Sequence, residues 1–267
     1  MKQGYRMDAY RALHRSSRLP ETAAAAVRRG IGVKSLLRRA CAVSALLWCA
    51  HVAAAPYPNA DQLRAAIASV ASLLNANGIA LQILDAQKEG LDQPLLAAVL
   101  SARGDSCLVF YNTKPEDGLT QFFGTFEDQD LAVLLNALAV HEATHCFEQR
   151  EAFVHKRFAR ILPADFQSDA TTVQGYISAV KSGALVTWGE ALADIASVLY
   201  LKEAVPERWE YFAGRLAAMR ADLARKWPEH NTSGWLNRII AGRAGRDAHE
   251  SLFETALQLR SRYRPQQ

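Results

Sequence analysis

Hydrophobic and polar residues follow one another along this chain mainly with the period of an α-helix. The clearest case runs from about Asp128 to beyond Glu151, where leucines recur every three or four positions and form an apolar stripe. After Val154 the same pattern returns several times, separated by proline and glycine. After Val154, helices are therefore predicted at about 167–182, 188–203, 207–226, 233–241 and 246–262. Two more are predicted before the long helix, at about 61–74 and 93–102.

Two short segments have the pattern of β-strands instead. Residues 79–84 alternate around Gln82, and residues 106–112 are β-branched and aromatic between turn-forming dipeptides. Residues 114–125 are predicted to form a loop. Because strands and helices do not alternate regularly, a doubly wound parallel sheet is excluded. The predicted fold class is α+β and predominantly helical, with a short strand before the long helix and a helical C-terminal part.

The first 54 residues differ in charge from the rest. They contain ten of the 31 Lys and Arg residues but two of the 27 acids. Basic residues precede an apolar stretch at 40–50, which is too short to span a bilayer and is followed by small residues. We expect residues 1–54 to be an N-terminal extension with an export signal that is cleaved after Ala54. The part of the extension before the signal can also result from a translation start that was assigned too far upstream. An uncleaved segment anchored in the membrane is the alternative.

Residues 55–267 are predicted to form a single catalytic domain that is periplasmic or secreted and is not inserted in the membrane. This part has 21 basic and 25 acidic residues, so 21 − 25 gives a net charge of −4. It has no basic stripe interleaved with aromatic residues, which argues against nucleic acid as a partner.

Two cysteines, Cys107 and Cys146, remain in this domain. In an oxidising compartment they can form a disulfide bond, which would close a loop of about 40 residues. Two buried free thiols are the alternative.

The segment VHEATHC, residues 140–146, carries the chemistry. His141 and His145 are four residues apart and therefore lie on one face of a helix, where their imidazoles can bind one Zn²⁺. Glu142 can accept a proton from a water molecule on that metal. A His-Glu-x-x-His string arises by accident in about one chain of this length in a hundred. The sequence thus predicts one zinc ion per chain, with Glu142 as general base.

A catalytic zinc site needs a third protein ligand. Glu151 follows His145 by six residues, but a ligand at that spacing requires a glycine turn, and Glu148 stands in the helix there. His155 lies too near along the same helix. Both are therefore disfavoured.

Glu190, in the segment TWGEALADIA, is the favoured third ligand. Asp194 follows it by one helical turn and can accept the other N–H of a ligand histidine, which fixes the tautomer of that histidine. Two alternatives remain. Glu190 can instead form a capping box with Thr187, or Asp194 can be the ligand in its place.

HEATH followed by GEALAD resembles the gluzincins, the thermolysin-like zinc metallopeptidases, whose pattern is HExxH followed by an ExxxD helix. The resemblance covers Val140–Cys146 and Gly189–Ile195. It implies a zincin-like fold in which His141, His145 and Glu190 bind zinc, Glu142 is the general base and Asp194 orients His141.

In that family a strand at the edge of the cleft pairs with an extended substrate, and residues 107–112 are the expected counterpart here. An ordinary core strand is the alternative. The gap between the two motifs is longer than in thermolysin, and Gly189 stands where asparagine is common. The resemblance therefore implies nothing about individual substrate subsites.

Stabilisation of an oxyanion needs a hydrogen-bond donor beside the metal. His230 is the first candidate, with Tyr176 and Tyr200 behind it, and a helix cap near Thr232 is the competing role for His230. The predicted function is an exported zinc metallopeptidase acting on a peptide or protein. The alternatives are a zinc amidase acting on cell-wall peptides, a zinc-binding protein without turnover, and a metal-free interaction protein.

Overall fold

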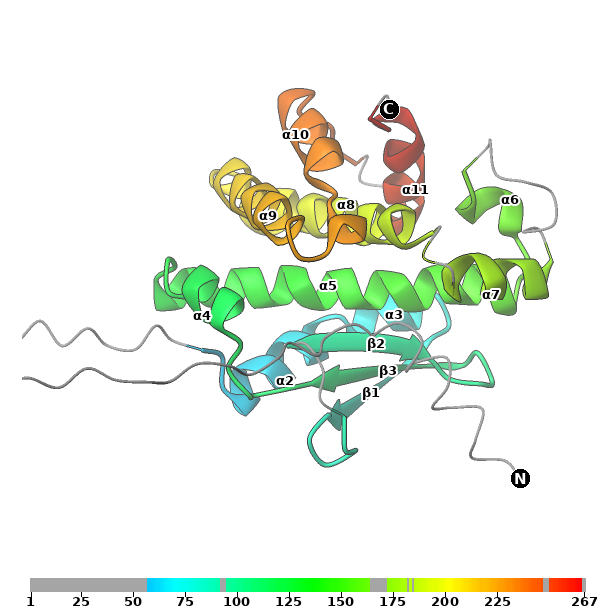
Figure 1. The fold of residues 1–267 in the computed structure, drawn as a ribbon, viewed down its shortest axis with the longest axis horizontal. Helices are drawn as coiled ribbons and strands as arrows, with labels where there is room; N and C mark the ends of the chain where they lie inside the picture. The colour runs from blue at the N-terminus through cyan, green and yellow to red at the C-terminus, as the bar shows by residue number, and fades with distance from the viewer. Residues whose placement is uncertain are drawn as a thin grey trace, which may run out of the picture. The chain divides into compact units, whose positions relative to one another are not determined.

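The long helix predicted from its leucine stripe, α5, is the central element of the fold (Figure 1). It spans Asp128–Phe153, and three of its leucines, Leu131, Leu134 and Leu135, are buried. A small sheet with helices α2 and α3 lies on one side of α5, and helices α8 to α11 lie on the other.

This computed structural model describes residues 57–91, 95–163, 172–181, 183, 185–246 and 250–265. All of them belong to the compact unit Ala54–Gln267. The export signal predicted at 1–54 lies outside the described residues.

The sheet has three strands in the order β1-β3-β2, namely Ala80–Asp85, Ser106–Tyr111 and Leu96–Leu100. β1 is parallel to β3, and β2 is antiparallel to it. The strand at 106–112, expected at the edge, is therefore the central strand, which corrects that prediction. The edge strand beside α5 is β2, where the sequence predicted a helix at 93–102.

Most of the remaining chain is helical. α2 begins with a capping box in which Asn59 accepts hydrogen bonds from backbone N–H groups and Gln62 accepts one from Asn59. Part of the loop predicted at 114–125 is the helix α4, whose Phe122 and Phe123 are buried. The helices span Ala60–Ser69 (α2), Ala71–Ala76 (α3), Asp117–Phe123 (α4), Phe158–Ile161 (α6), Val173–Lys181 (α7), Val186–Ala204 (α8), Trp209–Leu223 (α9), Ser233–Ala241 (α10) and Leu252–Arg262 (α11), with a 3₁₀ turn η2 at Pro228–His230.

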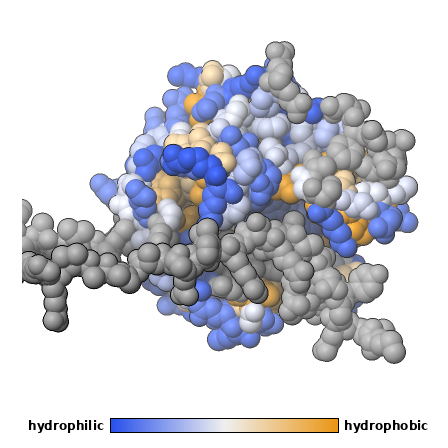
Figure 2. All heavy atoms as spheres, viewed as in Figure 1, coloured by the Kyte–Doolittle hydropathy of each residue, from blue (hydrophilic) through white to orange (hydrophobic). Residues whose placement is uncertain are grey.

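The predicted fold class is confirmed in its coarse form, as a predominantly helical α+β protein. α8 is buried continuously from Ala191 to Leu199 because it packs against α5, α9, α10 and α11. On the face shown in Figure 2 the described surface is mostly hydrophilic, with small apolar patches. Among the described residues no single helix is long and apolar enough to cross a membrane. Of the helices described, only α7 and α8 taken together have the length and composition of a membrane span, and the angle between these two helices is 91°.

A disulfide bond joins Cys107 of β3 to Cys146 of α5. Both cysteines are fully buried. Because Cys146 directly follows His145, the bond attaches the central strand to the helix beside the histidine motif.

Replacing both cysteines, Cys107→Ala with Cys146→Ala, is expected to lower the free energy of unfolding by about 4 kcal/mol, because the loop spans 39 residues. Urea unfolding measures this. Reduced wild-type protein is the control and should match the double variant. Equal stability of the oxidised and reduced wild type would contradict the prediction.

Candidate metal centre

Helix α8 crosses α5 closely at the histidine motif, and this crossing assembles the site. α8 packs against α5, and two of its small residues, Ala193 and Ala196, are fully buried. The hydroxyl of Ser197 donates a hydrogen bond of 2.7 Å to the carbonyl of Ala137 on α5. Two turns earlier on α8, Glu190 therefore faces the motif on α5.

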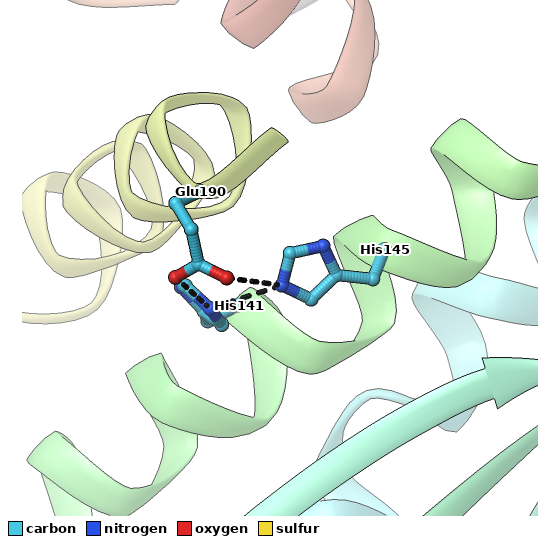
Figure 3. A group of neighbouring side chains, drawn as sticks. All are labelled: His141, His145 and Glu190. Carbon is cyan, nitrogen blue, oxygen red and sulfur yellow. Dashed lines mark hydrogen bonds and ion pairs between the residues drawn. The ribbon is translucent and has the colours of Figure 1, made fainter. Parts of the chain in front are cut away.

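His141, His145 and Glu190 point toward a common centre (Figure 3). The two Nε2 atoms are 3.1 Å apart. His141 Nε2 is 3.4 Å from Glu190 Oε2, and His145 Nε2 is 3.5 Å from Glu190 Oε1. Among the described residues this is the one group of three that could hold a metal ion.

The three side chains fit a zinc ion. Ligand atoms about 2.1 Å from a tetrahedral metal lie about 3.4 Å from one another. Each histidine Nε2 lies at about that distance from one of the two Glu190 oxygens, and one ligand atom from each residue gives a group within 4.8 Å. Two imidazoles and a carboxylate are also the ligand set of many catalytic zinc sites, which keep a further position for water.

Asp194 fixes the orientation of His141. Its Oδ1 lies 2.8 Å from His141 Nδ1, so that a proton on Nδ1 leaves Nε2 with a free lone pair toward the centre. The hydroxyl of Thr232 donates to Oδ2 of Asp194, and Thr232 is completely buried. The two carboxylate oxygens of Asp194 are thus bonded to His141 and Thr232. This favours Glu190 over Asp194 as the third ligand.

Arg220 of α9 is the residue of this site that the sequence analysis did not identify. Its guanidinium contacts both acids, with Nη2 2.9 Å from Glu190 Oε2 and Nε 2.8 Å from Asp194 Oδ2. Arg220 is 8% exposed. It lies 26 residues beyond Asp194, on a helix whose pattern is that of an ordinary amphipathic segment, so no local signal marks it.

The charges around the centre shift the pKa values of its acids. Burial alone would raise the pKa of Asp194, but Arg220 and His141 outweigh burial and hold it at about 2. The same two neighbours, with His230, hold the pKa of Glu190 well below its usual range against burial. Both carboxylates are therefore ionised at neutral pH.

The two histidines are affected in opposite directions. Burial alone would lower the pKa of His141, but Asp194 and Glu190 raise it to about 10. Burial, together with the positive charge on His141, lowers the pKa of His145. Without metal, His141 therefore carries the proton at neutral pH, whereas His145 is neutral.

Glu142 stands beside the centre without being part of the ligand group. Burial raises its pKa to about 7, partly offset by His141 and by a hydrogen bond from the backbone of Ala98 on β2. A carboxyl group with a pKa near neutrality is suited to accept and return a proton.

His230 also lies at the site. Its Nδ1 is 3.4 Å from Glu190 Oε2, and its side chain is 31% exposed. The 3₁₀ turn that carries it is attached to α8 by a hydrogen bond of 2.6 Å from the Thr187 hydroxyl to the carbonyl of Glu229. The other two candidates lie elsewhere. Tyr176 packs against the rings of Phe153 and Phe158, and Tyr200 is ten residues beyond Glu190 on α8.

The disfavoured ligand candidates do not join the centre. Glu151 forms an ion pair of 2.7 Å with Arg160, and His155 lies 3.9 Å from Glu151. The capping box proposed for Glu190 is absent from the described start of α8, because Leu185 is the N-cap residue and Thr187 bonds to Glu229 instead.

No family model matches the chain, and neither a curated protein nor a solved structure matches it. The case for a function therefore rests on the geometry of the site.

Zinc binding should release at least one proton per ion at pH 8. At that pH the metal must displace the proton that His141 holds with a pKa of about 10, whereas His145 and Glu142 have already lost theirs. Between about pH 7 and pH 10, zinc affinity should accordingly rise about tenfold per pH unit. Calorimetric titration in buffers with different ionisation enthalpies measures the released protons, and a value near zero would contradict this charge assignment.

Proposed function

We propose that this protein is a zinc-dependent metallopeptidase of the gluzincin type with a zincin-like fold. The observation that carries the proposal is the convergence of His141, His145 and Glu190 on one centre, with Glu142 beside it and outside the ligand set. A second carboxylate, Asp194, lies behind His141 in the position that the ExxxD pattern implies.

Each residue of the site has a chemical task in peptide hydrolysis. Zinc bound there would supply Lewis acidity, which activates a water molecule and polarises the scissile carbonyl. Glu142 accepts the proton of that water and passes it to the leaving amine. His230, partly exposed beside Glu190, is placed to donate a hydrogen bond to the developing oxyanion. Arg220 and Asp194 hold Glu190 and His141 in place.

The edge of β2 is the proposed substrate-binding strand, in place of residues 107–112. Leu95 and Ser101 make their backbone hydrogen bonds to Asn112 and Ser106, on the β3 side. The N–H groups of Ala98 and Leu100 therefore point the other way, where the first bonds Glu142 and the second bonds the side-chain oxygen of Gln149 at 2.8 Å. An extended peptide that pairs with this edge would replace these two hydrogen bonds and would pass directly over Glu142.

The proposed location is the periplasm or the exterior of the cell. The basic and apolar composition of residues 1–54 and the disulfide bond between Cys107 and Cys146 support it, because disulfides persist in oxidising compartments.

The variant Glu142→Gln tests the proposal most directly. It should keep one zinc per chain, because Glu142 is not a ligand, but lose the proton acceptor. We expect hydrolysis of an internally quenched peptide library to fall by about 10²- to 10⁴-fold. Glu127→Gln, an exposed acid at the start of the same helix, is the matched control and should be fully active.

The outcomes separate the alternatives. Glu142-dependent cleavage of cell-wall peptides but not of the library would favour the amidase. Zinc binding with no Glu142-dependent hydrolysis of either substrate would favour a zinc-binding protein without turnover.

A further inference from the structure

A second buried ion pair lies one helical turn from the metal centre. Arg260 of α11 is 1% exposed, and its Nη1 donates hydrogen bonds of 2.9 Å to Glu148 Oε1 on α5 and to the carbonyl of Trp188 on α8. Its Nη2 donates to the carbonyl of Ile161 at 2.9 Å, and the guanidinium lies 4.3 Å from the centre of the Trp188 ring. One side chain thus joins α5, α6 and α8.

The place where Arg260 joins the two helices is directly beside two zinc ligands. Glu148 is three residues after His145 on α5. The carbonyl that Arg260 binds on α8 belongs to the peptide group between Trp188 and Gly189, which precedes Glu190. A helical turn is rigid on this scale, so a shift at Glu148 or Gly189 moves the neighbouring ligand with it.

Gly189 leaves little space between the helices. A Cβ atom at this position would lie 3.0 Å from Glu148 Oε2, closer than ordinary packing allows. Glu148 cannot easily move away because Arg260 holds its carboxylate. The absence of a side chain at Gly189 therefore allows the observed approach of α8 to α5.

We propose that Arg260, Glu148 and Gly189 form a helix clamp that sets the distance between His145 and Glu190 and thereby the affinity of the site for zinc. This inference rests on the proposed metal centre. The three are positioning residues, and none of them contacts the common centre of the ligands. Metal–ligand distances lie within about 0.2 Å of their usual values, and a Cβ at Gly189 would force its neighbour to move by a few tenths of an ångström.

The variant Gly189→Ala tests the clamp, with zinc affinity measured by competition with a chromogenic chelator. The dissociation constant should rise about tenfold or more, and the visible spectrum of the Co²⁺-substituted protein should change. The unfolding temperature of the metal-free variant should stay near that of the wild type. Gly214→Ala is the matched control, because it lies within helix α9 and a Cβ there meets nothing within 4 Å. It should leave both zinc affinity and the Co²⁺ spectrum unchanged.

Rescue by a shorter acid separates positioning from general instability. Adding Glu148→Asp to Gly189→Ala withdraws the carboxylate from the new methyl group and should restore part of the lost zinc affinity. Glu148→Asp alone is the control, because it also lengthens the contact with Arg260. If Gly189→Ala does not fold, Arg260→Lys takes its place. Lysine keeps the positive charge but lacks the planar set of N–H donors with which Arg260 joins the helices, so this variant should bind zinc more weakly than the wild type.

Unchanged zinc affinity in the first folded variant, or a loss that Glu148→Asp does not repair, would overturn the clamp while leaving the metal centre intact. A wild-type protein that binds no zinc would overturn the metal centre and the clamp together.

Discussion

The structure depends on a cluster of opposite charges buried where α5, α8 and α9 meet. Asp194 and Glu190 lie in the interior, where an unpaired carboxylate would cost several kcal/mol. Arg220 contacts both acids, and His141 lies against both as well. Removing any one partner would leave an uncompensated buried charge, so the crossing of the helices and the geometry of the site are linked.

This cluster is balanced with and without a metal ion. Without metal and below about pH 7, protonated His141 and Arg220 offset Glu190 and Asp194, and a neutral Glu142 leaves the sum at zero. With Zn²⁺ bound, His141 loses its proton and ionised Glu142 completes the balance, so the sum is again zero. The pKa of about 7 for Glu142 places its change of charge in the range where an enzyme would use it. The same residues that stabilise the fold therefore prepare the site for a divalent cation.

The sequence predicted well what has a strong local pattern. The leucine stripe located α5 within a few residues, and helix α10 spans the predicted residues. The spacing of His141, His145 and Glu190 also selected three residues that the fold brings together.

The errors and omissions involve distant contacts. The run LLAAVL at residues 95–100 consists of residues that suit a helix, but pairing with β3 makes it an edge strand. That same pairing, together with the pairing of β1, places residues 106–111 in the centre of the sheet. Arg220 and Arg260 act through partners that are 26 to 112 residues away, and nothing near them in the sequence distinguishes them from surface arginines.

The metal content of the purified protein, determined by elemental analysis beside the variants His145→Ala and Glu190→Ala, tests the central claim most directly. The account predicts about one zinc per chain in the wild type and weakened or lost zinc in both variants. A wild-type protein that folds normally yet holds no zinc, even after zinc is supplied, would contradict it and remove the basis for regarding this protein as a metallopeptidase.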